Sequence, residues 1–460
     1  MKKNIKTKPI LKIMKHFLLF TALFVFLQIT GFAQEKKWTL GECVAYAIEN
    51  SQSMERQLAQ NEIYKQNFVG AIINQAPSIS GYSSATSNYG RNIDYTTNTY
   101  VNTNSFSNNY QLTASMPVFS GLANLNTTRY HNIMRKMGYE RKQELEDDIS
   151  LRTIAAFYDV LYQQAMVDLA REQLITSDED LRKVQQMESL GIKGKADLFE
   201  MEAQRAGVQY NMVRQQNTLR TLVLKLKEVM FFPIEDALEI DTTIPEILII
   251  TEFENDISLD FESTKTNLPA VNVLNLQLMG AKVDYAANKG SLFPSISFNT
   301  GLNTGYSSTR LDNNGQKVSF EDQFKNNVGK YLGLSLSIPL FNNNILGTKV
   351  RISKQNYHIA QITYNEEIRK LQNVIQQALL DMEGAAEEFM QAQQREKSSD
   401  LANTINQRKY EQGLLSVIEL HTSENRLLEA KAEKVRAQVT YMIKKRLVDY
   451  YNSGVIKIEN

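Results

Sequence analysis

Few residues in this chain have the types and the spacing that chemistry requires. The only cysteine, Cys43, cannot form an internal disulfide, and it lies on an apolar stripe with helical spacing, where a small buried hydrophobic residue is expected. Acidic pairs such as Asp147-Asp148 are expected on solvated helix faces, and no nucleophile set, acid–base pair or phosphate-binding loop stands out. Beyond the N-terminal segment, three scattered histidines lack the spacing of metal ligands: His131, His358 and His421. We therefore expect no enzyme activity, no cofactor and no metal site.

Two carboxylates have more defined positions, because each follows a turn signal. Asp197 comes shortly after residues 191–194, Gly-Ile-Lys-Gly, and Glu419 comes shortly after residues 413–416, Gly-Leu-Leu-Ser. Glycine permits a tight turn, and an acid in the first turn of a helix interacts favourably with the positive end of the helix dipole. The pattern predicts that one helix ends and another begins at each turn.

The turns lie within two long stretches without proline, residues 118–232 and 340–460. In both stretches apolar residues recur at steps of three and four, as in the seam of a coiled coil. A helix from about 122 to 190 would be roughly 100 Å long at 1.5 Å per residue. We therefore predict helical hairpins at about 121–230 and 343–450 that form columns and not compact domains.

The second half of the chain repeats the first. Residues 76–80, Ala-Pro-Ser-Ile-Ser, recur at 293–297 as Phe-Pro-Ser-Ile-Ser, and Met-Pro-Val-Phe at 116–119 recurs at 338–341 as Ile-Pro-Leu-Phe. The second offset, 222 residues, holds without a gap through both turns. Because a repeat decides the architecture, we divide the chain into a first structural repeat, 34–260, and a second, 261–460.

Each half also contains segments that alternate with a period of two, which predicts strand hairpins at about 78–119 and 295–341. In one segment, Phe106, Tyr110, Leu112 and Met116 alternate with Ser, Asn, Gln and Thr. Segments of about ten residues with one apolar face and aromatic residues toward the ends are typical of transmembrane β-barrels. A soluble β-sandwich with one wet face shows the same alternation.

The small number of strands decides between these alternatives. Four strands cannot bury a sandwich core, and open sheet edges are excluded from lipid, so strands from several copies must close one barrel. Two copies would give about eight strands, a barrel that side chains fill, whereas three would give about twelve and leave a lumen.

The N-terminal segment indicates export. Six lysines without an acid precede an uncharged run, 17–29, which ends in Gly-Phe-Ala at 31–33, and this pattern predicts a secretory signal peptide over 1–33. A membrane-anchoring helix is the alternative, but the run is shorter than the roughly 20 residues that span a bilayer. Removal of the segment would change the net charge from 0 to −6. No basic stripe remains, so nucleic acid is not an expected partner.

The chain after residue 33 resembles the TolC-like outer membrane efflux proteins, also called outer membrane factors. The resemblance is carried by the duplicated half, the helix starts at Asn50-Ser51 and Asn267-Leu268-Pro269, the Pro-Ser strand entries, and the Tyr-x-x-Gly turn that ends at Gly413. It implies an α+β membrane protein of the outer membrane that extends into the periplasm. In a homotrimer, long helical hairpins would form a periplasmic helical barrel, and four transmembrane strands per protomer would share a 12-stranded barrel. An equatorial segment would fall at 231–260 and in the C-terminal residues.

The resemblance also implies a passive exit duct of a tripartite efflux or type I secretion system, which exports drugs, metals or proteins. The implied partners are outer membrane lipid, a periplasmic adaptor (membrane fusion protein) and an inner-membrane pump or ABC exporter. The adaptor would contact the helix-turn tips: Leu190, Gly191, Ile192, Gly413, Leu414 and Ser416.

The resemblance also implies a gate at the end of the helical barrel where the helix-turn tips lie. An acidic constriction would lie at Glu419, and Tyr410 would take part in a closing network with Asp197, although Leu415 occupies the position where family members often carry arginine. Helix capping by Glu419 explains that residue equally well, as does a tight turn for the tip glycines. The alternative for the whole chain is an extended periplasmic coiled-coil adaptor or structural protein. An adaptor would need lipoyl-like and β-barrel modules around one helical hairpin, and the duplicated helix pair does not fit that plan.

Overall fold

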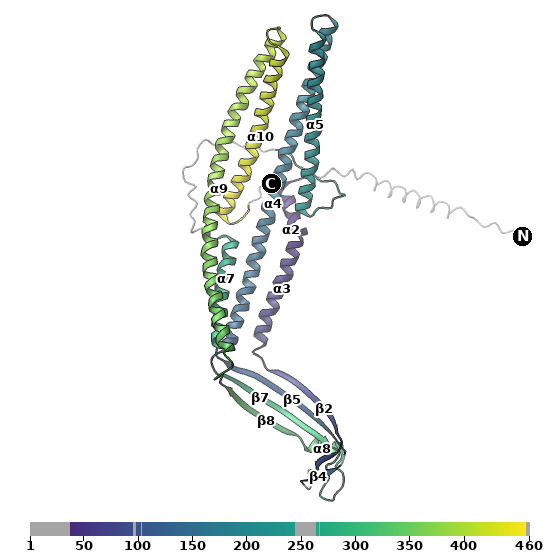
Figure 1. Cartoon of the computed structure of the whole chain (residues 1–460), viewed down its shortest axis with the longest axis vertical. Coiled ribbons are helices and arrows are strands. Elements are labelled where there is room, and N and C mark those ends of the chain that lie inside the picture. The colour runs from purple at the N-terminus through teal and green to yellow at the C-terminus, as the bar shows by residue number, and fades with distance from the viewer. Residues whose placement is uncertain (1–36, 95–97, 103, 244–263, 266, 457–460) are drawn as a thin grey trace, which may run out of the picture.

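The computed structural model describes residues 37–94, 98–102, 104–243, 264–265 and 267–456. Its helices form a long column with two free hairpin tips at one end and a sheet at the other (Figure 1). The predicted signal peptide and most of the predicted equatorial segment lie outside the described residues.

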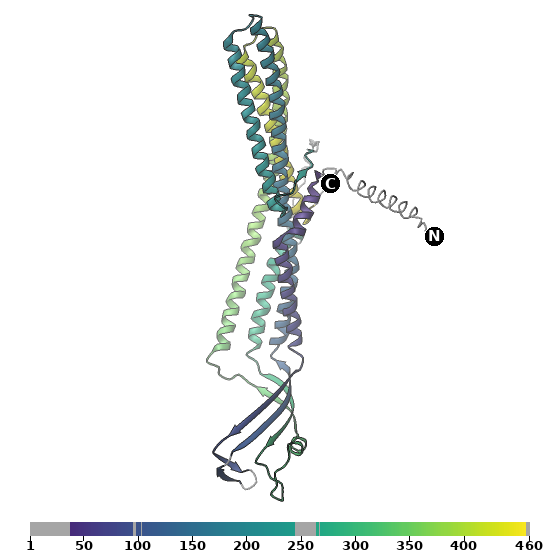
Figure 2. The same ribbon diagram turned by 90° about the vertical axis from the view of Figure 1, so that its right-hand side faces the viewer.

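Two helical hairpins make up the upper part of the column. The first consists of α4 (Ala123–Ser189) and α5 (Lys195–Met230), and the second of α9 (Ile345–Glu411) and α10 (Val417–Ser453). α4 and α9 have 67 residues each, which corresponds to about 100 Å of helix. Figure 2 shows that the lower halves of α4 and α9 run beside shorter helices. These are α2 (Leu40–Asn50), α3 (Gln52–Ile73) and α7 (Pro269–Gly290). Within the described residues, no helix has an apolar stretch of the length that a bilayer crossing needs.

The main elements follow a similar order in both halves: one or two short helices, two long strands with an insertion between them, a long helix and its hairpin partner. The turn from the second strand to the long helix also has the same backbone conformation. Gly121 and Leu122 have φ of 60° and 68°, and Asn343 and Asn344, 222 residues later, have φ of 54° and 59°. Glycine and asparagine tolerate this left-handed region, and Leu122 adopts it beside Gly121, so two different residue pairs build the same turn.

The four predicted strand segments form one antiparallel sheet in the order β2-β5-β7-β8. Their bounds are β2 (Ser78–Asn88), β5 (Ser105–Ser120), β7 (Ser295–Ser307) and β8 (Gly329–Ser337). β2 and β8 lie at the two edges, so each pairs with a strand of this sheet on one side only. The connections carry a small hairpin, β3 (Arg91–Asp94) with β4 (Thr99–Asn102), and helix α8 (Phe320–Asn326).

One face of this sheet is apolar and exposed in the protomer. The register places Leu112 opposite Leu302 and Ala114 opposite Thr300, which pairs with Leu332, so alternate residues of the four strands share this face. Leu332, Leu334 and Leu336 are 78%, 71% and 63% exposed. A β-bulge between Pro117 and Phe119 brings Phe119 opposite Ile296, and thereby onto the same apolar face.

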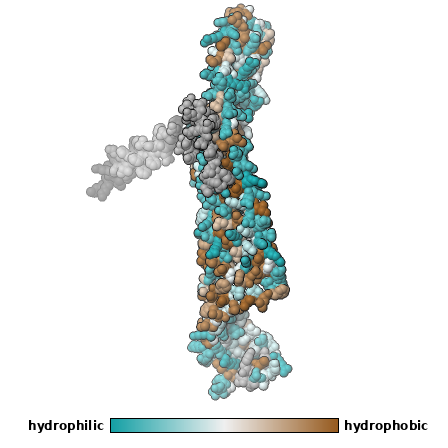
Figure 3. Space-filling model, turned by 90° about the vertical axis from the view of Figure 1, so that its left-hand side faces the viewer, coloured by the Kyte–Doolittle hydropathy of each residue, from teal (hydrophilic) through white to brown (hydrophobic). Residues whose placement is uncertain are grey.

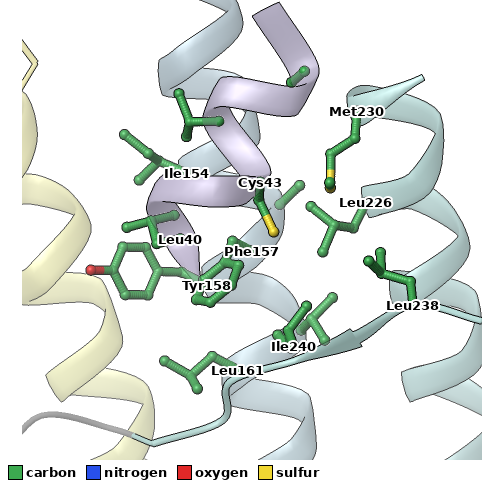
Figure 4. Close-up of a cluster of buried hydrophobic side chains, with 14 of the residues drawn as sticks. Leu40, Cys43, Ile154, Phe157, Tyr158, Leu161, Leu226, Met230, Leu238 and Ile240 are labelled. Atoms are coloured by element: carbon green, nitrogen blue, oxygen red, sulfur yellow. The ribbon is translucent and has the colours of Figure 1, made fainter. Parts of the chain in front are cut away.

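The largest core cluster lies at mid-column, where α2 packs against α4 and α5 (Figure 4). Cys43 has no exposed surface there, beside Leu226 and Met230, so the prediction of a buried hydrophobic residue on a helix is confirmed. The two-stranded parallel sheet of β1 (Lys37–Trp38) and β6 (Glu239–Ile240) closes this cluster.

The expectation that Asp147 lies on a solvated helix face is wrong. Asp147 is only 5% exposed, and its carboxylate accepts hydrogen bonds from the Tyr450 hydroxyl of α10 at 3.0 Å and from Gln143 at 3.2 Å. Asp148, the other member of the pair, is exposed and pairs with Arg152 at 2.6 Å. Adjacent helical residues point about 100° apart, so one of two neighbouring acids can face another helix while the other faces water.

Tyr450→Phe is expected to lower the free energy of unfolding by about 1–3 kcal/mol, because a buried carboxylate loses a hydrogen-bond donor. Chemical denaturation of the wild type and of the variant measures the difference.

Burial raises the pKa of Asp147, so the carboxyl group of Asp147 keeps its proton to higher pH in the native state than in the unfolded chain. The contribution of this group to stability therefore falls as pH rises through its raised native pKa. Denaturation of the wild type and of Asp147→Asn at several pH values should show that the variant lacks this fall. Equal dependence of stability on pH in the two proteins would contradict a raised pKa for Asp147 in the native state.

Candidate functional site

The two hairpin tips have the same backbone geometry. Each long helix ends at a glycine with positive φ, 72° at Gly191 and 73° at Gly413. The next residue donates its N–H back across the turn, from Ile192 to the Met187 carbonyl at 2.8 Å and from Leu414 to the Lys409 carbonyl at 2.9 Å. This bonding pattern terminates a helix through a left-handed residue, so the tight-turn role of both glycines is confirmed.

Residues beside these glycines leave apolar side chains in water. Leu190 and Ile192 are 73% and 67% exposed on the first tip, and Leu414 and Ile418 are 71% and 68% exposed on the second. Figure 3 shows apolar side chains at this end of the column, beyond a polar stretch. Exposed apolar groups on a rigid turn are suited to contact another protein.

Glu419 forms a capping box at the start of α10. Its carboxylate accepts hydrogen bonds from the Ser416 N–H at 2.9 Å and the Ser416 hydroxyl at 2.8 Å, and its own N–H donates to the Ser416 hydroxyl oxygen at 3.3 Å. The bonds from the Ser416 backbone and then its hydroxyl hold the pKa of Glu419 below the ordinary value. Glu419 therefore stays charged as well as capping the helix.

Asp197 takes the equivalent place at the start of α5, where it accepts a hydrogen bond from the Gly194 N–H at 3.2 Å. Gly194 has no hydroxyl oxygen that could accept a hydrogen bond from the Asp197 N–H. The first tip therefore has one of the two reciprocal hydrogen bonds of a capping box, whereas the second tip has both. The carboxylate of Asp197 is thus held at its own turn, although its charge also acts on Tyr410.

Tyr410 lies between the two hairpins. It packs against a small cluster that contains Val184, Met201 and Val417, and the Lys193 ammonium lies 5.5 Å from the centre of its ring. Burial, and then the negative charges of nearby carboxylates, raise the pKa of Tyr410, so its hydroxyl stays protonated. Lys193 thus supplies a cation to this tyrosine from the first tip, a contact that the sequence analysis missed.

A second group of residues missed from the sequence joins the hairpins below the tips. His421 of α10 is 9% exposed, with Nδ1 2.9 Å from Glu424 Oε2 and Nε2 3.1 Å from the Met201 sulfur of α5. Asp180 of α4 is 6% exposed, and burial and the charge of Glu424 raise its pKa. A cavity of about 180 Å³ beside His421 is lined by both hairpins. In the first repeat, Phe199 occupies the position of His421, so no repeated motif indicates this contact.

The predicted site residues therefore gather at one end of the column but do not make one network. Lys193 and Tyr410 meet between the hairpins, whereas Glu419 and Asp197 are each bonded at their own helix start. Among the described residues, no group of three or more His, Cys, Asp or Glu side chains is arranged to hold a metal ion.

Solved outer membrane channels share the fold of this protomer. The structure of the outer membrane protein VceC from Vibrio cholerae matches over 90% of this chain and 96% of its own, with a TM-score of 0.75 and 12% identity. The Campylobacter jejuni CmeC outer membrane channel matches over 92% and 87%, with a TM-score of 0.76 and 14% identity. The open state of the Neisseria gonorrhoeae MtrE outer membrane channel matches over 90% and 88%, with a TM-score of 0.72 and 16% identity.

The sequence adds a family match over part of its length. Residues 262–446 match the family model described as outer membrane efflux protein, and a search of curated protein sequences finds no match. The predicted resemblance to TolC-like outer membrane efflux proteins is therefore confirmed. The chain therefore has the fold of solved outer membrane channels, and most of its second half matches the outer membrane efflux protein family.

Proposed function

We propose that three copies of this chain form one channel, with twelve strands in the outer membrane and a tube of helices in the periplasm. The observation that carries this proposal is the exposed apolar face of a sheet with two free edges, β2 and β8. Water disfavours such a face, and lipid disfavours such edges. Edge-to-edge pairing of β8 with β2 of the next copy removes the cost of the edges, and insertion of the closed barrel into lipid removes the cost of the face. Three copies are the smallest number that leaves a lumen.

The channel serves as the passive exit duct of a tripartite efflux or type I secretion system. A periplasmic adaptor binds the exposed tip residues, which are Leu190, Gly191, Ile192, Gly413, Leu414 and Ser416, and an inner-membrane pump or ABC exporter delivers the substrate. Support comes from the apolar side chains held in water on two rigid turns. The division into a signal peptide and two structural repeats, 34–260 and 261–460, belongs to the same proposal.

The entrance of the duct lies at the same tips. Three copies of Glu419 form an acidic constriction, and Tyr410 holds the two hairpins of each copy together with Asp197 and Lys193. The capping box supports this role because it fixes the Glu419 carboxylate at the helix start while leaving it exposed and charged. Lys193 over the Tyr410 ring supplies the cation that Leu415 does not.

Paired cysteines on the two edge strands test the assembly. In a Cys43→Ala background, Ser80→Cys on β2 is combined in turn with cysteines at 331, 333 and 335 on β8. We expect at least one pair to join neighbouring copies on oxidation, which gives covalent dimers and trimers from the outer membrane fraction on a non-reducing gel.

The matched control joins strands inside one copy. Gln111 on β5 and Asn303 on β7 are register partners, so cysteines at these positions form a disulfide without a ladder of larger species. Recovery of the mature protein from the soluble periplasmic pool, with monomers only for every edge pair, would instead favour the extended coiled-coil adaptor or structural protein.

A further inference from the structure

Helix α8 is held against the outer end of the sheet by a set of specific hydrogen bonds. Gln323 is 1% exposed, and its amide donates to the carbonyls of Ser307 and Val318 at 2.9 Å each and accepts from the Ser307 N–H at 2.9 Å. Asn327, directly after the helix, donates to the Gly305 carbonyl at 2.7 Å, and Thr304 donates to the Phe324 carbonyl at 2.7 Å. The β7–β8 connection is therefore pinned to the end of β7 and is not a loose loop (Figure 2).

The pinned helix adds two aromatic rings to those of the strands. Phe320 and Phe324 stack at 5.7 Å, Phe324 lies 5.5 Å from Tyr110, and Phe320 lies 5.5 Å from Tyr306. Phe106 continues the group at 6.5 Å from Tyr306. We name these five residues the aromatic cluster.

The aromatic cluster lies on the apolar face of the sheet. Tyr110 pairs with Thr304 in the register, two residues along from the Leu112 and Leu302 pair, and alternate residues share a face. Phe106, Phe320 and Phe324 remain 41%, 45% and 40% exposed, so the rings are packed against one another but not covered. Glu321 and Lys325, about 100° around α8 from the two rings, form a salt bridge at 2.7 Å.

A second set of exposed aromatic residues lies at the opposite end of the sheet. Phe119, which the bulge turns onto the apolar face, is 41% exposed, and Phe293 and Phe341 in the adjoining turns are 55% and 84% exposed. From Phe106 to Phe119 a strand with a tilt of about 40° spans roughly 30–35 Å, close to the hydrocarbon thickness of about 30 Å. Leucines fill the face between the two sets.

We propose that α8 and the aromatic cluster form a lipid-binding surface at the acyl–headgroup boundary of the outer leaflet, on the outside of the barrel. This inference rests on the proposed function, and it identifies which residues fix the depth of the protein in the membrane. Rings with one apolar side and a nearby polar group are favoured at that boundary. Because the helices extend from the other end of the sheet, the aromatic cluster faces the external leaflet and the set around Phe119 faces the periplasmic one.

Tryptophan fluorescence in vesicles with brominated lipids tests the depth of each position. Trp38 is the only native tryptophan, so a Trp38→Phe background gives a silent protein into which one reporter is introduced. Phe324→Trp reports on the aromatic cluster. Leu332→Trp reports on the middle of the apolar face, and Tyr331→Trp reports on the opposite face at the same height.

We expect Phe324→Trp to be quenched at least twofold more by lipid brominated near the headgroup than by lipid brominated near the chain ends. Leu332→Trp should show the reverse order, and Tyr331→Trp should be quenched by neither lipid. Quenching of Leu332→Trp without quenching of Phe324→Trp would overturn this inference while leaving the barrel intact, because a neighbouring copy or a loop would then cover the cluster. Absence of quenching at both positions would overturn the barrel as well.

Discussion

Gly290→Ala is expected to lower the free energy of unfolding by about 3 kcal/mol or more, at the upper end of what overpacking costs. A Cβ at Gly290 would lie 2.6 Å from the Gly121 carbonyl oxygen and 2.9 Å from the Ala123 nitrogen. All of these are backbone atoms, so no side chain can rotate away. Two connections meet at this point, β5 to α4 and α7 to β7, where the sheet bends away from the column (Figure 1).

Thermal unfolding of the detergent-solubilised protein, followed by circular dichroism, measures this cost. At about 2–4 °C per kcal/mol the midpoint should fall by roughly 6–12 °C. Gly207→Ala is the matched control, because a Cβ at this position in α5 meets nothing within 4 Å. Alanine there should stabilise the helix by about 0.5–1 kcal/mol. A Gly290→Ala variant with an unchanged midpoint would show that the two connections do not touch in the folded protein.

The elements of this fold could be predicted because their signals are local and are repeated. Helical periodicity without proline gave a helix from about 122 to 190, and α4 runs from Ala123 to Ser189. Alternation predicted that Leu112 and Met116 share one face of a strand. The register of β5 against β7 confirms this, because Leu112 lies opposite Leu302 and Met116 opposite Phe298. The repeat also located both hairpin turns at the glycines where the long helices end.

Contacts between the two halves could not be predicted, because a repeat describes each half but not how the halves meet. Asp147 faces Tyr450 of the other half, and His421 faces Met201, yet neither pair has an equivalent at the 222-residue offset. The position of α8 depends on hydrogen bonds from Gln323 to backbone groups of β7, and a lone glutamine in a polar loop gives no signal of this kind.

The predicted gate residues illustrate a different limit. The sequence left two explanations for Glu419, a helix cap or a cation-attracting ring, and the hydrogen bonds with Ser416 are compatible with both. A cap depends on the shape and the acceptor oxygen of residue 419, whereas a ring depends on its charge. Glutamine separates the two, because it also serves in a capping box but carries no charge.

Glu419→Gln is therefore expected to reduce the cation selectivity of the channel with only a small loss of thermal stability, because glutamine keeps the capping box but gives up the favourable interaction of the charge with the helix dipole. Three carboxylates at about 10 Å from the axis would attract a monovalent cation by roughly 1.2 kcal/mol in unscreened water, which is about eightfold in the cation concentration at the constriction. At 0.15 M salt, screening reduces this to about twofold. The reversal potential of purified channels in planar bilayers under a salt gradient measures the permeability ratio, and block by divalent cations should weaken in parallel.

Ser416→Ala is the converse variant, since it removes the hydroxyl of the capping box and keeps the charge. Loss of a serine cap costs about 1 kcal/mol of stability, so the unfolding midpoint should fall while the permeability ratio stays close to that of the wild type. The dependence on salt separates an effect of the carboxylate charges from an effect of an altered pore shape. The difference in permeability ratio between the wild type and Glu419→Gln should shrink as the salt concentration rises, because salt screens charge but does not change shape. If Glu419→Gln conducts with unchanged selectivity at low salt, then Glu419 caps α10 and has no part in the constriction.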